Sequence, residues 1–344
     1  MSIGRDTIEV LVAAQWEKVL GAPPVSIDDN FFSLGGDSFK AARVASGLRV
    51  ALGKEVPLHE MFERASVRTQ AEFLRSKDTA GARGLVTMKA DGDGAPLVLL
   101  PGGGGSLVGL GAFAGSGFDR PVYGLRAPGL CSGEDSVESM TELSAHFVDV
   151  LSAAGIPRRV HLAGYCFGGV FAYHLAEVLT GLGWEVLSVT LLDSSLAAPD
   201  LPHGEIVGQR LAQLMAGAGI DEPNNGPLTP ETLFARFKES GRDLLEEDAA
   251  AFQRRLNVYA SLWRIVVDYR PQAVGLPVLL YSLPDRLDLA PQTPAAPGVL
   301  DWSELGCTRF RQVNLPELDT SLTAHPPVLE GVEKWLQENE GTAC

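Results

Sequence analysis

The fold is decided by residues 160–179, which read VHLAGYCFGGVFAYHLAEVL. The first four residues form a mainly apolar run that is typical of a buried strand, and the last eleven place apolar residues at helical spacing. Between these two parts, glycines stand on either side of Cys166. The stretch therefore predicts a strand, a sharp turn with Cys166 at its centre, and a helix that starts directly behind the turn.

The pattern Gly164-Tyr165-Cys166-Phe167-Gly168 resembles the nucleophile elbow of α/β-hydrolases, G-x-[nucleophile]-x-G. The elbow needs glycines because its tight turn leaves no room for side chains beside the central residue. Cys166 stands where most such enzymes carry serine. The N–H groups at the start of the following helix favour a thiolate and any oxyanion formed there. The alternative interpretation is a buried cysteine in a glycine turn.

Length, charge and cysteine content limit the possible functions. A chain of 344 residues exceeds a typical single domain, so we expect two domains of unequal size. The net charge of −15 argues against nucleic acid and anionic membranes as partners. The sequence has no apolar run of membrane-spanning length and no targeting segment at its start, so we expect a cytoplasmic protein. Four cysteines without a CxxC or a histidine-spaced pair argue against disulfides and a metal site.

Residues 1–76 are predicted to form a small four-helix bundle. Helical spacing over 6–20 ends at Gly21, and another helix continues from Ser38. Two shorter helices are predicted at 58–63 and 66–76.

Residues 30–39 of this bundle read NFFSLGGDSF, which resembles the motif of peptidyl carrier proteins, an aromatic pair followed by G-G-[DH]-S. The resemblance implies that a phosphopantetheinyl transferase attaches 4'-phosphopantetheine to Ser38 and that the cargo is aminoacyl or peptidyl. A helix N-terminus at this position also suits a phosphodiester. The alternative is that Asp37 and Ser38 only cap the helix.

A polar, small-residue stretch at 77–84 predicts a linker, and residues 85–344 form the second predicted domain. Residues 85–89 and 96–100 are predicted strands around a turn at 91–94.

The second of these strands runs into PGGGGS at 101–106. This glycine run lacks the Lys-Ser/Thr of a phosphate-binding loop. We therefore predict that backbone N–H groups near Gly102, together with that of Phe167, stabilise an oxyanion. A flexible loop without chemistry is the alternative.

The rest of the chain alternates strands and helices, which predicts a doubly wound, mostly parallel sheet with its site at the carboxyl ends of the strands. Together with the resemblance of the Cys166 turn to a nucleophile elbow, this implies an α/β hydrolase fold. A strand and its exit loop are predicted within 121–130, and further strands at 185–193, 277–282 and near 310–313. The predicted helices are 140–153 and 327–338. Residues 200–270 interrupt this pattern with helical segments, the longest from 244 to 269. Asp193 ends the strand that follows the Cys166 helix.

Residues 85–344 resemble a type I thioesterase domain from the end of a nonribosomal peptide synthetase. The matching features are the glycine-rich loop after the first long strand, the segments VYGL and APG at 122–129, LAGYCFGG at 162–169, and LLD at 191–193. The resemblance implies that Asp193 is the catalytic acid and that residues 200–270 form a helical lid over the acyl pocket. A turn residue is the other interpretation of Asp193.

The histidine departs from the family pattern. The family places its catalytic histidine in a Gly-x-His loop after the last strand, and here Asp319 lies at or next to that place. His325 comes several residues later, and either folds back to Cys166 or only starts the closing helix. His174 is a second candidate, although a residue two turns into the Cys166 helix usually points away from the elbow. His161, inside the strand, is interpreted as structural.

The resemblance implies a terminal carrier–thioesterase unit that works with upstream synthetase domains. A peptidyl thioester would pass to Cys166, with His325 as base and Asp193 orienting it, and leave by cyclisation, to a strained lactam or lactone, or by hydrolysis. Two other classes stay open: an editing hydrolase of type II that clears short acyl groups, and a catalytically idle docking module, which the missing loop histidine suggests.

Overall fold

The computed structural model describes residues 7–22, 26–37, 40–41, 43–45, 47–48, 56, 61–62, 64–75, 84–107, 109–115, 117–131, 133–195, 202, 204–209, 212, 249–283, 302–316, 318 and 321–341. The chain divides into two compact units, residues 1–81 with 207–254 and residues 82–206 with 255–344. Separate hydrophobic cores fill the helical N-terminal region and the two faces of a sheet.

The N-terminal region is helical, as predicted. Helices α1 (Thr7–Leu20) and α4 (Val67–Arg75) confirm two of the expected elements, and the described residues between 40 and 48 are helical as well. Trp16 and Phe31 are fully buried at its centre, with ring centroids 4.9 Å apart in an edge-to-face arrangement. The Trp16 indole N–H donates to Gln70 Oε1 at 2.9 Å, which satisfies the buried donor and ties α1 to α4.

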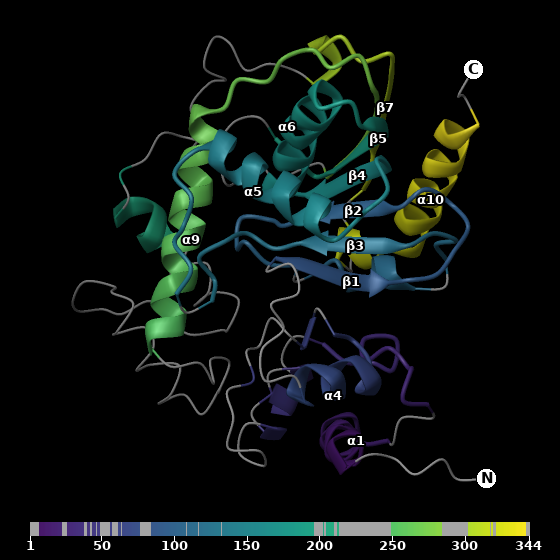
Figure 1. The fold of residues 1–344 in the computed structure, drawn as a ribbon, viewed down its shortest axis with the longest axis vertical. Coiled ribbons are helices and arrows are strands. Elements are labelled where there is room, and N and C mark those ends of the chain that lie inside the picture. The colour runs from purple at the N-terminus through teal and green to yellow at the C-terminus, as the bar shows by residue number, and fades with distance from the viewer. Residues whose placement is uncertain are drawn as a thin grey trace. The chain divides into compact units, whose positions relative to one another are not determined.

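The second unit is built on a seven-stranded sheet in the order β1-β3-β2-β4-β5-β6-β7 (Figure 1). The strands are β1 (Leu85–Lys89), β2 (Leu97–Leu100), β3 (Val122–Leu125), β4 (Arg159–Tyr165), β5 (Glu185–Leu192), β6 (Pro277–Ser282) and β7 (Arg309–Asn314). Every neighbouring pair is parallel except β1 with β3, so the mostly parallel sheet is confirmed. Although β1 and β2 follow each other around a turn, β3 lies between them.

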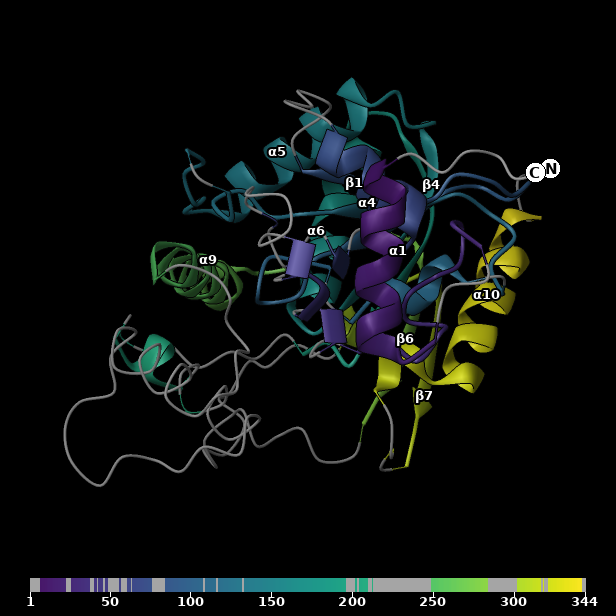
Figure 2. The same ribbon diagram turned by 90° about the horizontal axis from the view of Figure 1, so that it is seen from below.

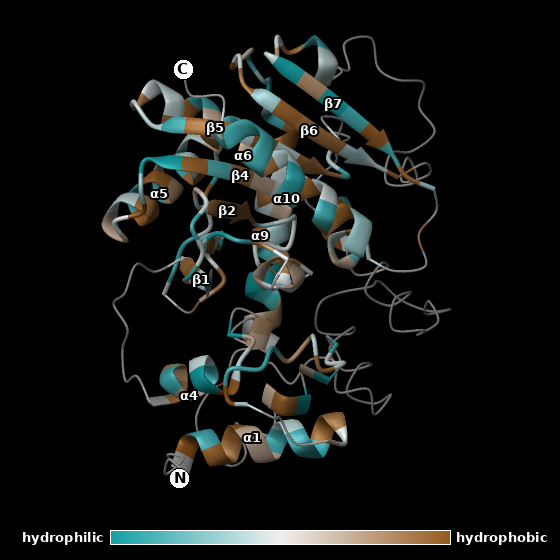
Figure 3. Cartoon of the chain, turned by 90° about the vertical axis from the view of Figure 1, so that its right-hand side faces the viewer, coloured by the Kyte–Doolittle hydropathy of each residue, from teal (hydrophilic) through white to brown (hydrophobic). Residues whose placement is uncertain are grey.

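Helices cover both faces of this sheet (Figures 1 and 2). Val98 and Leu100 point to the face covered by α5 (Met140–Ala153), α6 (Phe167–Gly181) and the Arg255–Asp268 part of α9 (Ala249–Asp268). Leu97 and Leu99 point to the opposite face, covered by α10 (Pro326–Glu340). Both faces of β2 are therefore buried, and the strand is hydrophobic along its length (Figure 3).

Part of the predicted lid lies within the described residues. Residues 204–209 are helical, and α9 accounts for most of the helix predicted from 244 to 269. Residues 213–248 lie outside the described part of the chain. None of the described helices has the length and the continuous apolar character that crossing a membrane requires.

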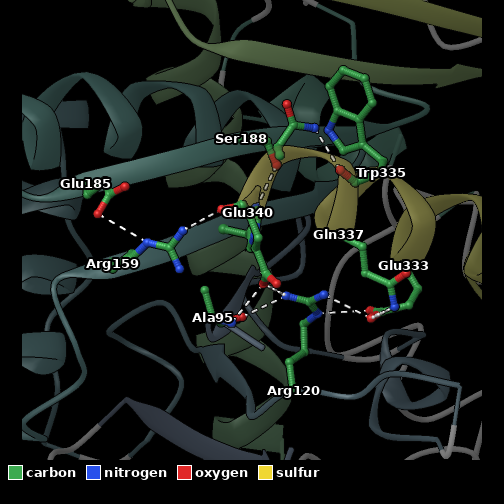
Figure 4. A network of polar contacts seen from close by, with 11 residues as sticks. Ala95, Arg120, Arg159, Glu185, Ser188, Glu333, Trp335, Gln337 and Glu340 are labelled. Carbon is green, nitrogen blue, oxygen red and sulfur yellow. Dashed lines mark hydrogen bonds and ion pairs between the residues drawn. The ribbon is translucent and has the colours of Figure 1, made fainter. Parts of the chain in front are cut away.

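The edge of the sheet where the parallel strands begin carries a network of charges (Figure 4). Arg120 is 1% exposed and binds Glu333 with two hydrogen bonds of 2.9 Å, and it also binds Glu340 and the Ala95 carbonyl oxygen. His161 Nδ1 lies 2.8 Å from Ser188 Oγ, and its Nε2 lies 3.4 Å from Glu340 Oε1. Burial lowers the pKa of His161 and so disfavours its charged form, and Arg120 and Arg159 supply the positive charges of this network.

Candidate active site

Cys166 occupies a sharp turn between β4 and α6. Its backbone angles are φ 56° and ψ −123°, in a region that residues other than glycine rarely adopt. The residue is the N-cap of α6, so the free N–H groups of the first helical turn lie next to it. Its own N–H donates to the Leu192 carbonyl oxygen at 2.9 Å. The sequence prediction of strand, turn and helix is confirmed at this point.

The glycines around Cys166 allow backbones to approach too closely for any side chain. A Cβ atom on Gly164 would lie 2.1 Å from the Gly168 carbonyl carbon, and one on Gly168 would lie 2.7 Å from the Leu100 carbonyl oxygen. A Cβ on Gly169 would lie 2.0 Å from Ser194 Oγ. The glycine pattern thus lets α6 press against the ends of β2 and β5, which fixes the elbow between them.

Asp193 lies beside Cys166 at the edge of the sheet. Tyr165 of β4 pairs with Leu192 of β5, so the next residue of each strand is Cys166 and Asp193. Asp193 also has a positive φ of 50°. Its N–H donates to the Tyr281 carbonyl oxygen at 2.7 Å, and its Oδ1 accepts from Leu283 N–H at 3.3 Å. The carboxylate therefore faces the end of β6.

The glycine-rich loop after β2 lies against the elbow. Gly105 N–H donates to the Gly102 carbonyl oxygen at 2.9 Å, which closes a turn. A Cβ on Gly102 would lie 3.5 Å from the Tyr165 carbonyl oxygen, and one on Gly103 would lie 3.1 Å from the Phe167 ring. Gly102 and Phe167, the two expected oxyanion donors, thus flank Cys166 from different elements.

The ion pair between Arg126 and Glu134, which the sequence did not predict, holds the segment that binds the glycine-rich loop at Gly105. Glu134 binds Arg126 through two hydrogen bonds of 3.0 and 3.1 Å and accepts N–H bonds from Gly129 and Cys131. Burial acts to raise the pKa of Glu134, but the Arg126 guanidinium and these N–H groups hold it below its ordinary value. The neighbouring Ala127 N–H then donates to the Gly105 carbonyl oxygen at 2.8 Å. A pair eight residues apart in a loop has no periodic signal in the sequence.

Helix α9 contributes aromatic rings next to the elbow. The Phe167 ring centroid lies 5.6 Å from that of Trp263, and Trp263 lies 6.0 Å from Tyr259. A Cβ on Gly103 would also touch Tyr259, at 3.2 Å. The predicted apolar stripe of this helix therefore packs over the glycine loop and the residue that follows Cys166.

His325 lies at the start of α10, directly after the short helix η4 (Leu322–Ala324). It is the N-cap residue of α10, but its side chain makes no capping hydrogen bond. Its Nδ1 is buried and has no hydrogen-bond partner within the described part of the chain. A buried polar atom in this state calls for an explanation.

The other candidate residues fall into two groups. His174 lies in α6 with Nδ1 2.8 Å from Glu177 Oε2 and its ring against Tyr269, so it ties α6 to the end of α9. Ser38 and Asp319 lie outside the described residues. Cys131, Cys166 and Cys307 are not in disulfides. No group of three His, Cys, Asp or Glu side chains among the described residues is arranged to hold a metal ion.

The residues before Ser38 form a tight glycine turn that leads into a helix. A Cβ on Gly36 would lie 2.3 Å from the Phe31 ring, so the turn needs glycine there. Asp37 Oδ1 accepts from Lys40 N–H at 2.7 Å, and the Asp37 carbonyl oxygen accepts from Ala41 N–H at 2.8 Å. Asp37 therefore caps the helix through its side chain.

Two protein families match this chain. The phosphopantetheine attachment site family matches residues 10–74, and the thioesterase domain family matches residues 95–306. The first match implies that 4'-phosphopantetheine is carried covalently on a serine.

The relatives are much longer proteins. A dimodular nonribosomal peptide synthase of Bacillus subtilis (strain 168) is 28% identical over 327 residues, which is 91% of this chain and 14% of that protein. Indigoidine synthase of Dickeya dadantii (strain 3937) is 29% identical over 263 residues, 74% of this chain and 17% of that protein. The chain therefore spans less than a fifth of the length of these two relatives.

Two solved structures share the fold. The four-domain nonribosomal peptide synthetase AB3403 superposes with a TM-score of 0.62 at 21% identity, over 98% of this chain and 26% of that one. The Vlm2 thioesterase domain bound with a dodecadepsipeptide superposes with a TM-score of 0.51 at 21% identity, over 75% of this chain and 98% of that one. Because the thioesterase family match covers more than half of the 344 residues, this chain belongs to the thioesterase domain family, with an α/β-hydrolase fold preceded by a phosphopantetheine carrier domain.

Proposed function

We propose that this chain is the terminal carrier–thioesterase unit of a nonribosomal peptide synthetase and that Cys166 is its nucleophile. The observation that carries the proposal is the strained position of Cys166 at the N-terminus of α6, between glycines whose replacement would collide with backbone. That position presents the thiol at the carboxyl edge of the sheet, beside Asp193 and the glycine loop. Upstream synthetase domains and a phosphopantetheinyl transferase are the implied partners.

Ser38 is the proposed attachment residue. Asp37 supplies the helix cap, and Gly36 keeps the turn open beside Phe31. When attached, 4'-phosphopantetheine supplies a thiol on which an acyl chain is presented as a thioester.

In the acylation step, Cys166 sulfur attacks the carbonyl carbon of the acyl thioester. The N–H groups of Phe167 and Gly102 would donate to the oxyanion, and the tetrahedral species collapses as the original thiol leaves with a proton. His325 is the proposed base, which takes the Cys166 proton and returns it to the leaving thiol. Its buried Nδ1 is the atom that Asp193 would bind, and this would orient the ring as in other triads.

In the release step, water or an amine or hydroxyl of the acyl chain attacks the acyl-cysteine, and Cys166 departs as the thiol. Because one thioester is exchanged for another, the acyl group keeps its activation, whereas a serine ester would lose part of it. We infer that the release step forms a demanding bond, such as a strained lactam or lactone. Cys166→Ser is then expected to shift the products towards linear acid, and equal product ratios from the two enzymes would contradict this argument.

The test uses the full chain carrying phosphopantetheine and loaded with a peptidyl group, followed by intact mass spectrometry. Release is expected in the wild type and is expected to stop in Cys166→Ala, while Ser38→Ala is expected to lose the mass gain from phosphopantetheinylation. Faster release of acetyl than of peptidyl groups would favour the editing hydrolase instead. No release of either group would favour the docking module.

A further inference from the structure

Thr323 lies in η4, two residues before His325. Its side chain binds η4 to the loop that follows β2. The side chain is buried, and its Oγ1 donates to the Gly109 carbonyl oxygen at 2.5 Å. Gly109 belongs to the same loop as Gly102. Its φ of +88° lies in the left-handed region, which glycine adopts without strain. One hydroxyl therefore connects the loop of the proposed base with the loop of a proposed oxyanion donor.

The direction of these hydrogen bonds follows from the number of protons available. Thr323 has one hydroxyl proton, which goes to the Gly109 carbonyl because a carbonyl only accepts. Ser321 Oγ, 3.0 Å from Thr323 Oγ1, must then be the donor in the second bond. The result is a short chain from Ser321 through Thr323 to Gly109.

The backbone of His325 is already fixed by the same turn. Its N–H donates to the Leu322 carbonyl oxygen at 3.3 Å, and its carbonyl oxygen accepts from Val328 and Leu329 N–H at 3.0 and 3.1 Å. The imidazole makes no cap bond, and its Nδ1 is buried without a partner in the described residues. The position of the His325 ring consequently depends on the position of η4. The Thr323 hydroxyl fixes η4 by its hydrogen bond to Gly109.

We propose that Thr323 is a positioning residue that holds His325 at the Cys166 edge of the sheet. The proposal rests on the proposed function, in which His325 is the base. Without the Thr323 hydroxyl, η4 is free to shift relative to the β2 loop, and a displacement of about 1 Å is enough to slow a reaction by about 100-fold. Activation of the thiol would then depend on the N–H groups at the start of α6 alone, so the thiolate would form at a higher pH, closer to the value of about 8.5 for an ordinary cysteine.

The test compares Thr323→Val, which removes the hydroxyl with little change in shape, with Thr323→Ser, which keeps it. In the full phosphopantetheinylated chain, Thr323→Val is expected to slow the single-turnover acylation of Cys166 about 10- to 100-fold, and Thr323→Ser is expected to stay near the wild type. Alkylation of Cys166 by iodoacetamide, resolved at the peptide level, gives a second readout. Its pH midpoint is expected to move towards about 8.5 in Thr323→Val.

His325→Ala separates this inference from the proposed function. If His325 is the base, its removal slows acylation by about 100-fold or more, and adding Thr323→Val to it has no further effect. A large defect in His325→Ala with wild-type behaviour of Thr323→Val would overturn the positioning role alone. Near-normal acylation in His325→Ala would overturn the base assignment and this inference together.

A second variant keeps the inference testable if Thr323→Val does not fold. Ser321→Ala removes the donor at the exposed end of the same chain of bonds, so a smaller shift of the alkylation midpoint in the same direction is expected. An unchanged midpoint in Ser321→Ala would count against the proposal.

Discussion

The two edges of the parallel sheet satisfy their polar groups in opposite ways. At the edge where the strands begin, Arg120, Glu333 and Glu340 bind one another, and Arg159 binds Glu185 and the Glu340 carbonyl oxygen. At the edge where the strands end, Cys166 and Asp193 have positive φ angles, and the buried Nδ1 of His325 lacks a partner among the described residues. Both edges belong to the same sheet and share its core.

The difference separates a charge-paired edge, the stabilising edge, from the edge that holds the proposed nucleophile Cys166, the reactive edge of the proposal. Positive φ angles in residues other than glycine cost about 1–3 kcal/mol each and persist only where the surrounding structure enforces them. At the Cys166 edge that enforcement comes from close backbone contacts at Gly164, Gly168 and Gly169.

Gly168→Ala is expected to have the largest effect on the reactive edge. The new Cβ would lie 2.7 Å from the Leu100 carbonyl oxygen, so α6 has to move away from β2. A displaced Phe167 N–H would slow acylation by about 100-fold or more, as measured by single-turnover mass spectrometry. Gly181→Ala is the matched control, since nothing lies within 4 Å of its Cβ, and it should leave acylation unchanged. Equal rates in the two variants would show that the elbow does not require this close contact.

At the stabilising edge, Glu333→Gln should lower stability without altering the acylation rate per folded molecule. Removing one carboxylate from a buried Arg120 leaves an under-compensated charge, at a cost of about 3–5 kcal/mol in the free energy of unfolding. Glu338→Gln is the control, because Glu338 pairs with Arg309 and Arg311 on the surface. Urea unfolding gives both values. A change in acylation rate as large as that of Gly168→Ala would contradict the separation of the two edges.

The stabilising edge should also make the stability of the fold depend on pH in acid. We expect this effect to be smaller than those of Gly168→Ala and Glu333→Gln. The His161 contact and Arg120 lower the pKa of Glu340 to about 2, although burial acts to raise it. A lowered carboxyl pKa adds stability above the unfolded value, and this stability is lost as the pH falls from about 4.5 to about 2. Because 23% of the side chain is exposed and solvent screens it, the contribution is about 1–2 kcal/mol. In Glu340→Gln this part of the pH dependence of unfolding should disappear, and an unchanged profile would contradict its assignment to Glu340.

Local patterns predicted the fold and the positions of Cys166 and Asp193. The glycine spacing around Cys166 is dictated by close backbone contacts, and the continuous apolar run of strands such as Leu97–Leu100 follows from burial on both faces. The Arg126–Glu134 pair and the Thr323–Gly109 bond were not predictable, since they join residues without a fixed spacing. The order of β1, β3 and β2 also depends on tertiary packing rather than on the turn between β1 and β2.

The central claim is that Cys166 carries the acyl group between loading and release. The most direct measurement is peptide-level mass spectrometry of the loaded full chain, quenched during a single turnover and compared before and after brief treatment with neutral hydroxylamine, which cleaves thioesters much faster than oxygen esters. The account predicts a transient acyl mass on the peptide that contains Cys166, removed by hydroxylamine and absent from Cys166→Ala. Release of product at the wild-type rate with no acyl mass on that peptide, or from Cys166→Ala, would contradict it.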